Sequence, residues 1–546
     1  MRADLAFLNG HVVTVDPARP HAEAVAVQGG RIVAVGSTPE VRAWIGPGTE
    51  VVDLSGRSLV PGFQDAHAHP CLAGIEMRQC DVSGLPEDPA AYAAAVADYA
   101  SAHPELPWIL GSGWAISAFP GGIASRHVLD AVVPDRPVML VNRDGHGAWV
   151  NTAALDLAGI DAAAPDPGDG RIERDAVGEP VGTLQEGAIK LVDRYAPDPH
   201  QSEIADGILE AQRYLLSLGI TAWQDAWVTP RQHAAYTDLA GDGRLLARVV
   251  GCLWWQRDRG ADQIPELVEQ RADATTGRYR ATSVKIMQDG VCENFTAAML
   301  TPYLDERGRP SDRVGISFVE PDEVARQVTA LDRLGFQVHF HAIGDRAVRE
   351  CLDAVAVARA TNGPSDNRHH VAHLQVIDPS DRPRFAELGV TANMQPLWAH
   401  HDAYQDELTI PFLGPERSAR QYPWRSLAAA GARLAMGSDW NVSTPNPFEL
   451  IHVAVHRHHP DGRNGVFYPD QRLTLDQALT AATMGSAYVN HLDGSTGSIT
   501  PGKLADLAVV DRTLAGFGRR ALDGDPTFID ATIDLTFIEG DLVHER

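Results

Sequence analysis

Short apolar runs separated by turn residues mark the N-terminal part of the chain. Residues 24–27 and 32–35 are two such runs, and Gln28-Gly29-Gly30-Arg31 lies between them. Two strand-like runs around a Gly-Gly pair predict a β-hairpin. Residues 51–59 have the composition of a further strand. The pattern therefore predicts a small, β-rich region at this end of the chain.

The C-terminal part has the same character. Residues 507–510 form an apolar run, and residues 531–538 alternate between apolar and polar before the turn residues 539–541. Strand-like segments at both ends that flank a long middle predict one small β-sandwich domain built from both termini. We place its limits at 1–58 and 490–546.

The middle of the chain alternates strand-like and helix-like segments. These are strand 284–287, helix 322–333, strand 336–340, helix 345–360, strand 371–374, helix 379–388, strand 432–436 and helix 474–483. Repeated β-then-α units imply a parallel sheet with right-handed crossovers. For this length an eight-stranded barrel fits better than an open sheet. The predicted fold class is therefore α/β, with a (β/α)8 TIM barrel over residues 59–489.

One region interrupts this rhythm. From about 75 to 200 the chain is rich in Pro, Gly, Ala and Asp, as in residues 161–182. We expect an insertion after the first barrel strand, and segments of this length inside a compact protein are usually functional lids or mobile loops.

Composition narrows the class of partner. Lys plus Arg is 46 and Asp plus Glu is 72, which gives a formal net charge of −26. A surface this acidic repels other anions, which disfavours binding to nucleic acids and to anionic membranes. No signal peptide or membrane span is apparent, and the five cysteines have no CxxC spacing. We expect a reduced, cytoplasmic protein that acts on a small molecule.

The 22 histidines are the least ordinary count, and several fall at strand ends. His67 and His69 lie at positions i and i+2, so on a strand both side chains point to the same face. Both could then bind one metal ion. The alternative is a pair of surface or loop residues, which is equally common for such a spacing.

Two further clusters end predicted strands. His339 and His341 share a face, and His341 is nearer the C-terminal end, where barrel active sites lie. His339 would be deeper, as a ligand or as a hydrogen-bonded core histidine. In the next cluster His373 ends the apolar run and is the natural ligand. His369 and His370 are less favoured, because they lie deeper or on the opposite face.

A carboxylate and a lysine complete the set. Asp439 follows an apolar strand and Gly437, a position suited to binding metal or moving protons, although a turn or helix-cap role is the alternative. Lys285 lies inside an apolar strand, where burial favours the neutral amine. Such an amine can take up carbon dioxide to form a carbamate that bridges two metals. The alternative is an ion-paired or snorkelling lysine.

These motifs resemble the amidohydrolase superfamily, and within it the YtcJ-like branch that includes N-substituted formamide deformylase. The HAIGD and GSDW segments are specific to that branch. The matching segments are Pro61 to His69, Asp144-Gly145-His146 with Trp149-Val150-Asn151, Lys285 with Asp289-Gly290, His341 to Asp345, His373, Gly437-Ser438-Asp439 and Gly502 to Asp506.

The resemblance implies a TIM barrel, a composite β-sandwich from both termini and an insertion after the first strand. It also assigns the metal ligands. His67 and His69 match the first-strand ligands, Lys285 the fourth-strand lysine, His341 and His373 the fifth- and sixth-strand ligands, and Asp439 the eighth-strand aspartate. Two zinc ions bridged by a carboxylated Lys285 are thereby expected. Mononuclear deaminases of the superfamily carry Glu where this chain has Gly344.

The function implied is that of an amidohydrolase, a hydrolase of carbon–nitrogen bonds other than peptide bonds. A metal-bridging hydroxide would attack an N-substituted formamide or a related amide, with Asp439 and Lys285 as catalytic residues. Cyclic-amide hydrolysis or deamination on the same site is one alternative. A non-catalytic metal-binding or regulatory protein is another.

Candidate substrate contacts come from the insertion and from aromatic residues near loops. His146 lies in the insertion, within a segment that matches the branch, and is a candidate hydrogen-bond donor. Trp114, Trp398 and Trp440 fall near presumed loops and are candidates for an aromatic-lined pocket, with ordinary packing as the alternative. His452 and His456 share a helix face and are expected to be solvated or to support other groups. Dimers are common in the superfamily, so a homodimer is compatible with the resemblance.

Overall fold

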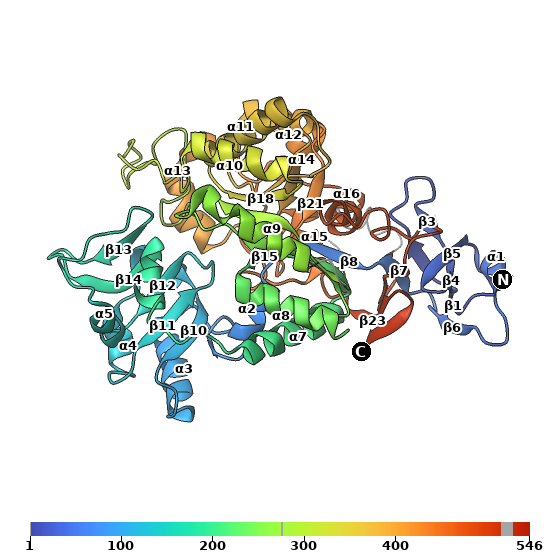
Figure 1. Ribbon diagram of the computed structural model, residues 1–546, viewed down its shortest axis with the longest axis horizontal. Coiled ribbons are helices and arrows are strands. Elements are labelled where there is room, and N and C mark those ends of the chain that lie inside the picture. Colours follow the sequence, from blue (N-terminus) through green and yellow to red (C-terminus); the bar gives the residue numbers. More distant parts are fainter. Residues whose placement is uncertain (1, 275–276, 515–527) are drawn as a thin grey trace.

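The computed structural model describes residues 2–274, 277–514 and 528–546. Three parts follow one another along the long axis of the molecule in Figure 1. A strand-rich insertion lies at one end, a barrel occupies the centre, and a sandwich of both termini lies at the other end. Among the described residues, no helix is long and apolar enough to cross a membrane.

The central part is an eight-stranded parallel barrel, which confirms the predicted fold class. Its strands, in sheet order, are β8 (Phe63–Ala68), β15 (Ile220–Val228), β16 (Arg248–Trp254), β17 (Tyr279–Met287), β18 (Gln337–Ala342), β19 (His370–His373), β20 (Thr391–Met394) and β21 (Leu434–Met436). The first and last strands meet just beyond β21, where the Asp439 N–H donates to the His67 carbonyl at 2.7 Å. This contact closes the ring at the C-terminal ends of the strands.

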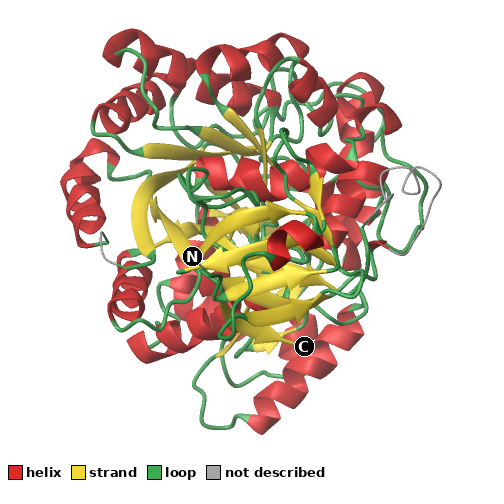
Figure 2. Ribbon diagram, turned by 90° about the vertical axis from the view of Figure 1, so that its right-hand side faces the viewer, coloured by secondary structure: helices red, strands yellow, loops and turns green. Residues whose placement is uncertain are grey.

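Helices surround the barrel, as Figure 2 shows. They are α2 (Pro70–Glu76), α7 (Gln201–Ser217), α8 (Pro230–Gly241), α9 (Ile264–Asp273), α10 (Pro321–Arg333), α11 (Asp345–Asn362), α12 (Arg382–Leu388), α13 (Ile410–Ser418), α14 (Trp424–Ala429), α15 (Pro447–His456), α16 (Leu475–Thr480) and α17 (Ser486–Val489). Helix α10 is representative, because it begins with a proline in its first turn and buries Val324, Val328 and Leu331 against the barrel.

Two predicted helices differ in detail from the observed ones. The segment 379–388 begins as a 3-10 turn over Pro379–Asp381 before α12. The segment 474–483 ends as an α-helix at Thr480 and widens into a π-helical turn, Ala481–Gly485. Local turn types of this kind depend on tertiary contacts and leave no trace in the hydrophobic pattern.

The sandwich joins strands from both termini, with the predicted hairpin as β4 and β5. One sheet has the order β5 (Arg31–Gly36), β4 (Ala24–Gln28), β1 (Leu5–Leu8), β6 (Glu50–Asp53). The other has the order β24 (Asp541–Glu545), β23 (Ile533–Ile538), β22 (Leu507–Val510), β7 (Ser58–Pro61), β2 (His11–Val13), β3 (His21–Ala22). Phe7 and Phe537 pack edge to face at 5.0 Å between the sheets. The short α1 (Thr38–Arg42) covers the outer face of the first sheet.

The sandwich is tied to the N-terminal end of the barrel. Strand β7 leads into β8 through Gly62 alone, and a Cβ at Gly62 would lie 2.3 Å from the Thr221 hydroxyl oxygen. Arg248, at the start of β16, donates hydrogen bonds to Asp506 and Glu539 of the sandwich. Arg248 and Asp506 are buried, so this pair fixes the two parts to each other.

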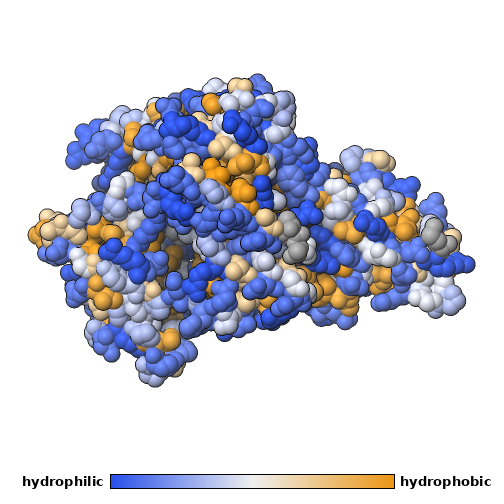
Figure 3. Space-filling view, viewed as in Figure 1, coloured by the Kyte–Doolittle hydropathy of each residue, from blue (hydrophilic) through white to orange (hydrophobic). Residues whose placement is uncertain are grey.

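The insertion carries its own six-stranded sheet. In sheet order the strands are β13 (Gly170–Arg174), β14 (Pro180–Glu186), β12 (Gly147–Val150), β11 (Val138–Asn142), β10 (Ile109–Trp114) and β9 (Cys80–Asp81). Its helices are α3 (Pro89–Ala102), α4 (Arg126–Asp130), α5 (Thr152–Ala158) and α6 (Lys190–Asp193). Figure 3 shows that the surface is hollowed between the insertion and the barrel. The residue limits of the domains stay a prediction of the sequence.

Candidate active site

The C-terminal ends of the barrel strands bring the predicted ligands together. His67 is on β8, His341 on β18, and His373 ends β19. His69 follows β8 directly, and Asp439 is the third residue after β21. The His373 ring lies 4.8 Å from that of His67 and 4.3 Å from that of His341, measured between centroids. This is the end of a barrel at which active sites are built.

Asp439 is the centre of the cluster. Its Oδ1 lies 3.1 Å from His67 Nε2 and 3.2 Å from His69 Nε2, and its Oδ2 lies 3.7 Å from His373 Nδ1. Burial alone would raise the pKa of Asp439, but the neighbouring histidines outweigh it and hold the pKa well below its usual value. The residue has a φ of 60°, an uncommon conformation that often marks functional positions.

A chain of hydrogen bonds orients His67. Its Nδ1 lies 2.7 Å from His339 Nε2, and His339 Nδ1 lies 2.7 Å from Gln224 Oε1. A carbonyl oxygen only accepts, so His339 donates from Nδ1 and accepts from His67 at Nε2. His67 therefore carries its proton on Nδ1. The lone pair of Nε2 lies beside Asp439 Oδ1, so the two atoms are both acceptors and suit a shared metal ion. His339 is thus a hydrogen-bonded core histidine, one of the two alternatives considered above.

His341 is oriented from the loop that follows β17. Its Nε2 lies 3.2 Å from the Gly290 carbonyl, which leaves Nδ1 free to act as a ligand. In the same loop the Asp289 carboxylate accepts from the N–H groups of Ile343 and Gly344 at 3.0 and 2.8 Å. Burial raises the pKa of Asp289 to about 8. The Asp289-Gly290 motif therefore links the loops that follow β17 and β18.

Lys285 is buried within β17, where its side chain interacts electrostatically with Asp439 and the site histidines. Burial lowers its pKa to about 8, against the opposing effect of Asp439. At pH 7 about one side chain in ten is therefore the neutral amine, and the fraction grows as pH rises. This is the form that could take up carbon dioxide.

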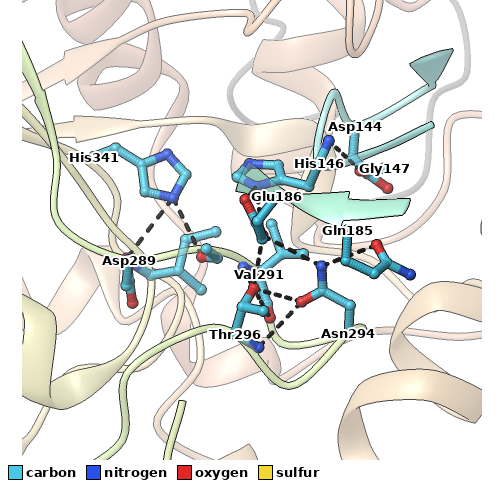
Figure 4. A network of polar contacts seen from close by, with 12 residues as sticks. Asp144, His146, Gly147, Gln185, Glu186, Asp289, Val291, Asn294, Thr296 and His341 are labelled. Carbon is cyan, nitrogen blue, oxygen red and sulfur yellow. Dashed lines mark hydrogen bonds and ion pairs between the residues drawn. The ribbon is translucent and has the colours of Figure 1, made fainter. Parts of the chain in front are cut away.

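The insertion contributes His146, whose ring lies 5.3 Å from that of His341. Its Nδ1 is 3.0 Å from both carboxylate oxygens of Glu186, the last residue of β14, as Figure 4 shows. Burial would lower the pKa of His146, but Glu186 outweighs burial and raises it to about 9. Sequence analysis did not find Glu186, because 40 residues separate it from its partner.

The cluster forms the floor of a cavity of about 450 Å³, its open side included. The lining comes from loops of the barrel and from the insertion. It consists of Asp144, His146, Val291, Glu293, His341, Ile343, His373, Gln375, Trp398, Tyr404, Tyr422, Asp439 and Val442. Trp398 and Val442 also line a second, larger cavity of about 1810 Å³, its open side included, which we call the vestibule. The vestibule is bordered by the insertion through Ser83, Glu87 and Arg143.

The three tryptophans named from the sequence have different positions. Trp398 lines both cavities and Trp440 lines the vestibule. Trp114 is fully buried in the core of the insertion, where its indole N–H donates to the Leu140 carbonyl at 2.8 Å. Its predicted place in the substrate pocket is therefore wrong, since its strand turns the ring away from the cavity and into the insertion.

The predicted solvent exposure of His452 and His456 is not observed. Both are buried, and their rings lie 4.6 Å apart on α15. His452 Nε2 is 3.3 Å from His458 Nδ1. They form a histidine cluster of their own on this helix.

The donor set fits a metal ion. Within the described chain, ligand atoms of His67, His373 and Asp439 lie within 4.8 Å of one another. His69 Nδ1 is buried and has no hydrogen-bond partner among the described residues. Imidazole nitrogens with a carboxylate are ligands that zinc and similar borderline ions prefer.

The sequence itself decides the family. Residues 50–544 match the model of the amidohydrolase family. The chain belongs to the amidohydrolase family. Membership confirms the prediction of an amidohydrolase, a hydrolase of carbon–nitrogen bonds other than peptide bonds. Residues 24–43 of this amidohydrolase also match the imidazolonepropionase-like composite domain of bacteria, in agreement with the sandwich.

Relatives of this amidohydrolase cover most of its length. Protein LONG AFTER FAR-RED 3 of Arabidopsis thaliana is 31% identical over 93% of this chain and 87% of its own length. N-substituted formamide deformylase of Arthrobacter pascens is 30% identical over 93% of each chain. Putative amidohydrolase YtcJ of Bacillus subtilis (strain 168) is 30% identical over 98% of each chain. The YtcJ-like branch expected from the motifs is thereby confirmed.

A solved structure has the same architecture. An uncharacterized metal-dependent hydrolase from Pyrococcus horikoshii OT3 superposes with a TM-score of 0.73, covering 94% of this chain and 98% of that one. The two chains are 23% identical, so this likeness speaks for the fold alone.

Gly344 separates this amidohydrolase from the mononuclear deaminase pattern. A Cβ at Gly344 would lie 2.0 Å from the Ala298 carbonyl oxygen. No side chain, and therefore no glutamate, fits there unless the backbone around Ala298 moves. The loop between β17 and α10 thus occupies the space that a catalytic glutamate at this position would need.

Proposed function

We propose that this amidohydrolase cleaves the amide-type C–N bond of a small molecule, an N-substituted formamide or a related amide. The proposed cofactor is zinc, with two ions bridged by a carboxylated Lys285. The proposed ligands are His67, His69, Lys285, His341, His373 and Asp439. The observation that carries the proposal is the Asp439 carboxylate, which faces His67, His69 and His373 on the floor of the cavity.

Bound zinc would lower the pKa of a water molecule to near 7 and polarise the substrate carbonyl. Asp439 supplies proton transfer: Oδ1 lies 3.1 and 3.2 Å from the Nε2 atoms of His67 and His69, among the proposed ligand atoms, whereas Oδ2 is 3.7 Å from His373 and is left for the proton. We assign Oδ2 to accept the proton of the attacking water and to deliver it to the leaving amine.

Lys285 reacts before turnover. Its neutral Nζ would attack carbon dioxide, form a C–N bond and lose one proton to solvent, which gives a carbamate anion. The low pKa of the buried amine supports this step. The product replaces a cation with an anion among four histidines, so it would complete the donor set.

The two cavities suit the two sides of such an amide. The inner cavity is small enough for a formyl or similarly short acyl group, and the vestibule has room for a larger N-substituent. Trp398 lines both cavities. The relative N-substituted formamide deformylase also supports this substrate class.

His146 is the proposed substrate contact from the insertion. Glu186 engages Nδ1, so Nε2 is the ring nitrogen left for the substrate oxygen. A small-molecule substrate as the sole class of partner, a homodimer and a cytoplasmic location remain predictions of the sequence.

The test is a screen of N-formyl, N-acetyl and cyclic amides with the released amine measured, together with zinc content per chain. We expect the N-formyl compounds to be cleaved fastest, with about two zinc ions per chain. Asp439→Asn should retain some metal and lose turnover, whereas the control Asp353→Asn on the exposed face of α11 should match the wild type. Turnover of Asp439→Asn at the wild-type rate would contradict the assigned proton transfer.

Cleavage of cyclic amides alone would replace the proposed substrate class with cyclic-amide hydrolysis. A wild-type protein that holds no metal and cleaves none of the amides would contradict the proposed function as a whole.

A further inference from the structure

Glu186 is the least expected residue at the cavity. It ends β14 of the insertion with φ 52° and ψ −124°, a conformation that a non-glycine residue rarely adopts. Backbone strain of this kind persists where the surroundings impose it. The contacts of Glu186 show what imposes it here.

Glu186 is joined to His146 through both backbone and side chain. The Glu186 N–H donates to the His146 carbonyl at 2.9 Å, and His146 Nδ1 lies 3.0 Å from each carboxylate oxygen. Both side chains are largely buried, with exposed fractions of 11% and 6%. An ionised carboxylate only accepts hydrogen bonds, so the proton of this contact is on His146 Nδ1. The ring orientation is thereby determined.

The barrel holds the same carboxylate from the other side. Thr296 Oγ1 donates to Glu186 Oε1 at 2.7 Å, and Asn294 Nδ2 donates at 3.3 Å. Both residues follow β17 in the loop that begins with the Asp289-Gly290 motif, and Figure 4 shows this loop passing beneath the carboxylate. A Cβ at Gly290 would lie 2.3 Å from Glu186 Oε1 and 2.0 Å from Thr296 Oγ1. The second residue of that motif must therefore be glycine for the carboxylate to fit.

We propose that Glu186 is a positioning residue that holds His146 with Nε2 toward the cavity, so that the insertion completes the active site by presenting a nitrogen to the substrate oxygen. The inference deepens the proposed function and rests on it for the identity of the substrate. Besides Glu186, the charged groups that act on His146 are Asp144 of the insertion and Asp439 at the barrel end, and the neighbouring titratable rings are His341 and His373.

The kinetic test compares Glu186→Gln, His146→Gln and the double variant on the best N-formyl substrate. Glutamine keeps the size of Glu186 and supplies only one acceptor oxygen, so His146 should lose its fixed orientation. We expect a fall of about 10- to 100-fold in kcat/KM for each single variant, mostly through kcat. The double variant should be no worse than His146→Gln alone, because Glu186 acts through His146.

Glu173→Gln is the matched control, since this glutamate lies on the neighbouring strand β13 and bonds Arg171. It should leave kcat and KM unchanged. The split between kcat and KM supplies a readout that a merely structural role would not give: in Glu186→Gln the loss should fall on kcat with KM nearly unchanged. Additive losses in the double variant, or a loss confined to KM, would overturn the proposal.

A second readout does not depend on turnover. Urea unfolding midpoints of the same four proteins form a double-mutant cycle, and coupling predicts that the second substitution adds little to the first. If the wild type cleaves no amide, the proposed function fails, and this cycle alone decides whether the two residues act as a unit. If each substitution lowers the urea midpoint by the same amount with and without the other, the coupling between Glu186 and His146 is refuted.

Discussion

His339 offers the sharpest test of how the site is built. It lies beneath His67 and connects it to Gln224 through two hydrogen bonds of 2.7 Å. Replacing His339 by leucine leaves the His67 Nδ1–H and the Gln224 carbonyl oxygen without these partners. Each buried group left unpaired costs about 1–3 kcal/mol, so the free energy of unfolding should fall by about 2–6 kcal/mol.

The effect on metal binding is the informative part. Residues that orient a ligating histidine typically contribute 10- to 100-fold to metal affinity, which is about 1.4–2.8 kcal/mol. We therefore expect His339→Leu to weaken zinc binding by that factor, measured by competition with a chromophoric chelator at fixed pH.

His369→Leu is the control. His369 is a buried histidine that also makes two hydrogen bonds, to the Val338 N–H and to Asp332, each 3.0 Å long. Its loss should cost similar stability and leave zinc affinity unchanged, because the side chain does not contact a ligand. Equal losses of affinity in the two variants would refute the argument that His339 acts through His67.

Three further predictions concern residues that stabilise the barrel and its contact with the sandwich. Gly344→Ala should destabilise the protein by about 1–3 kcal/mol, seen as a lower melting temperature, because its Cβ would press against the Ala298 carbonyl. Burial would raise the pKa of Asp332, but its hydrogen bonds outweigh burial and keep the pKa below the usual range. Asp332→Asn should therefore cost about 2–3 kcal/mol above pH 4, the unfolded pKa, and the deficit measured by urea unfolding should shrink as pH falls through the lower folded pKa. Arg248→Met should cost about 3–5 kcal/mol in the same assay, because it leaves Asp506 buried without its cation, and Arg248→Lys should recover part of this.

The barrel could be predicted from the sequence because its signals are local. An apolar strand followed by an amphipathic helix, as in residues 337–362, is recognisable in a short window. The positions of His341 and Asp439 follow from the same logic, since parallel strands present their C-terminal ends together.

Orientation could not be predicted in the same way. Which nitrogen of His67 carries the proton depends on Gln224, which lies on another strand and acts through His339. The pairing of His146 with Glu186 depends on a backbone angle that the sequence does not display. The prediction that Trp114 lines the substrate pocket was wrong for a related reason. A strand position alone does not say which face of the insertion sheet is covered by other residues.

The pairing of β7 with β22 has a consequence for biosynthesis. Strand β7 immediately precedes β8, which carries His67, yet its antiparallel neighbour β22 leaves the ribosome some 446 residues later. Until then β7 has an open edge on that side, and the Gly62 N–H lacks its acceptor, the Asp506 carbonyl. A nascent chain that stops after Asp439 contains every proposed ligand. It lacks β22, the strand that pairs with β7 and so stabilises the start of β8, just before His67 and His69. Maturation of the metal centre should therefore be among the last events of synthesis, and late nonsense truncations should yield protein that fails to retain zinc.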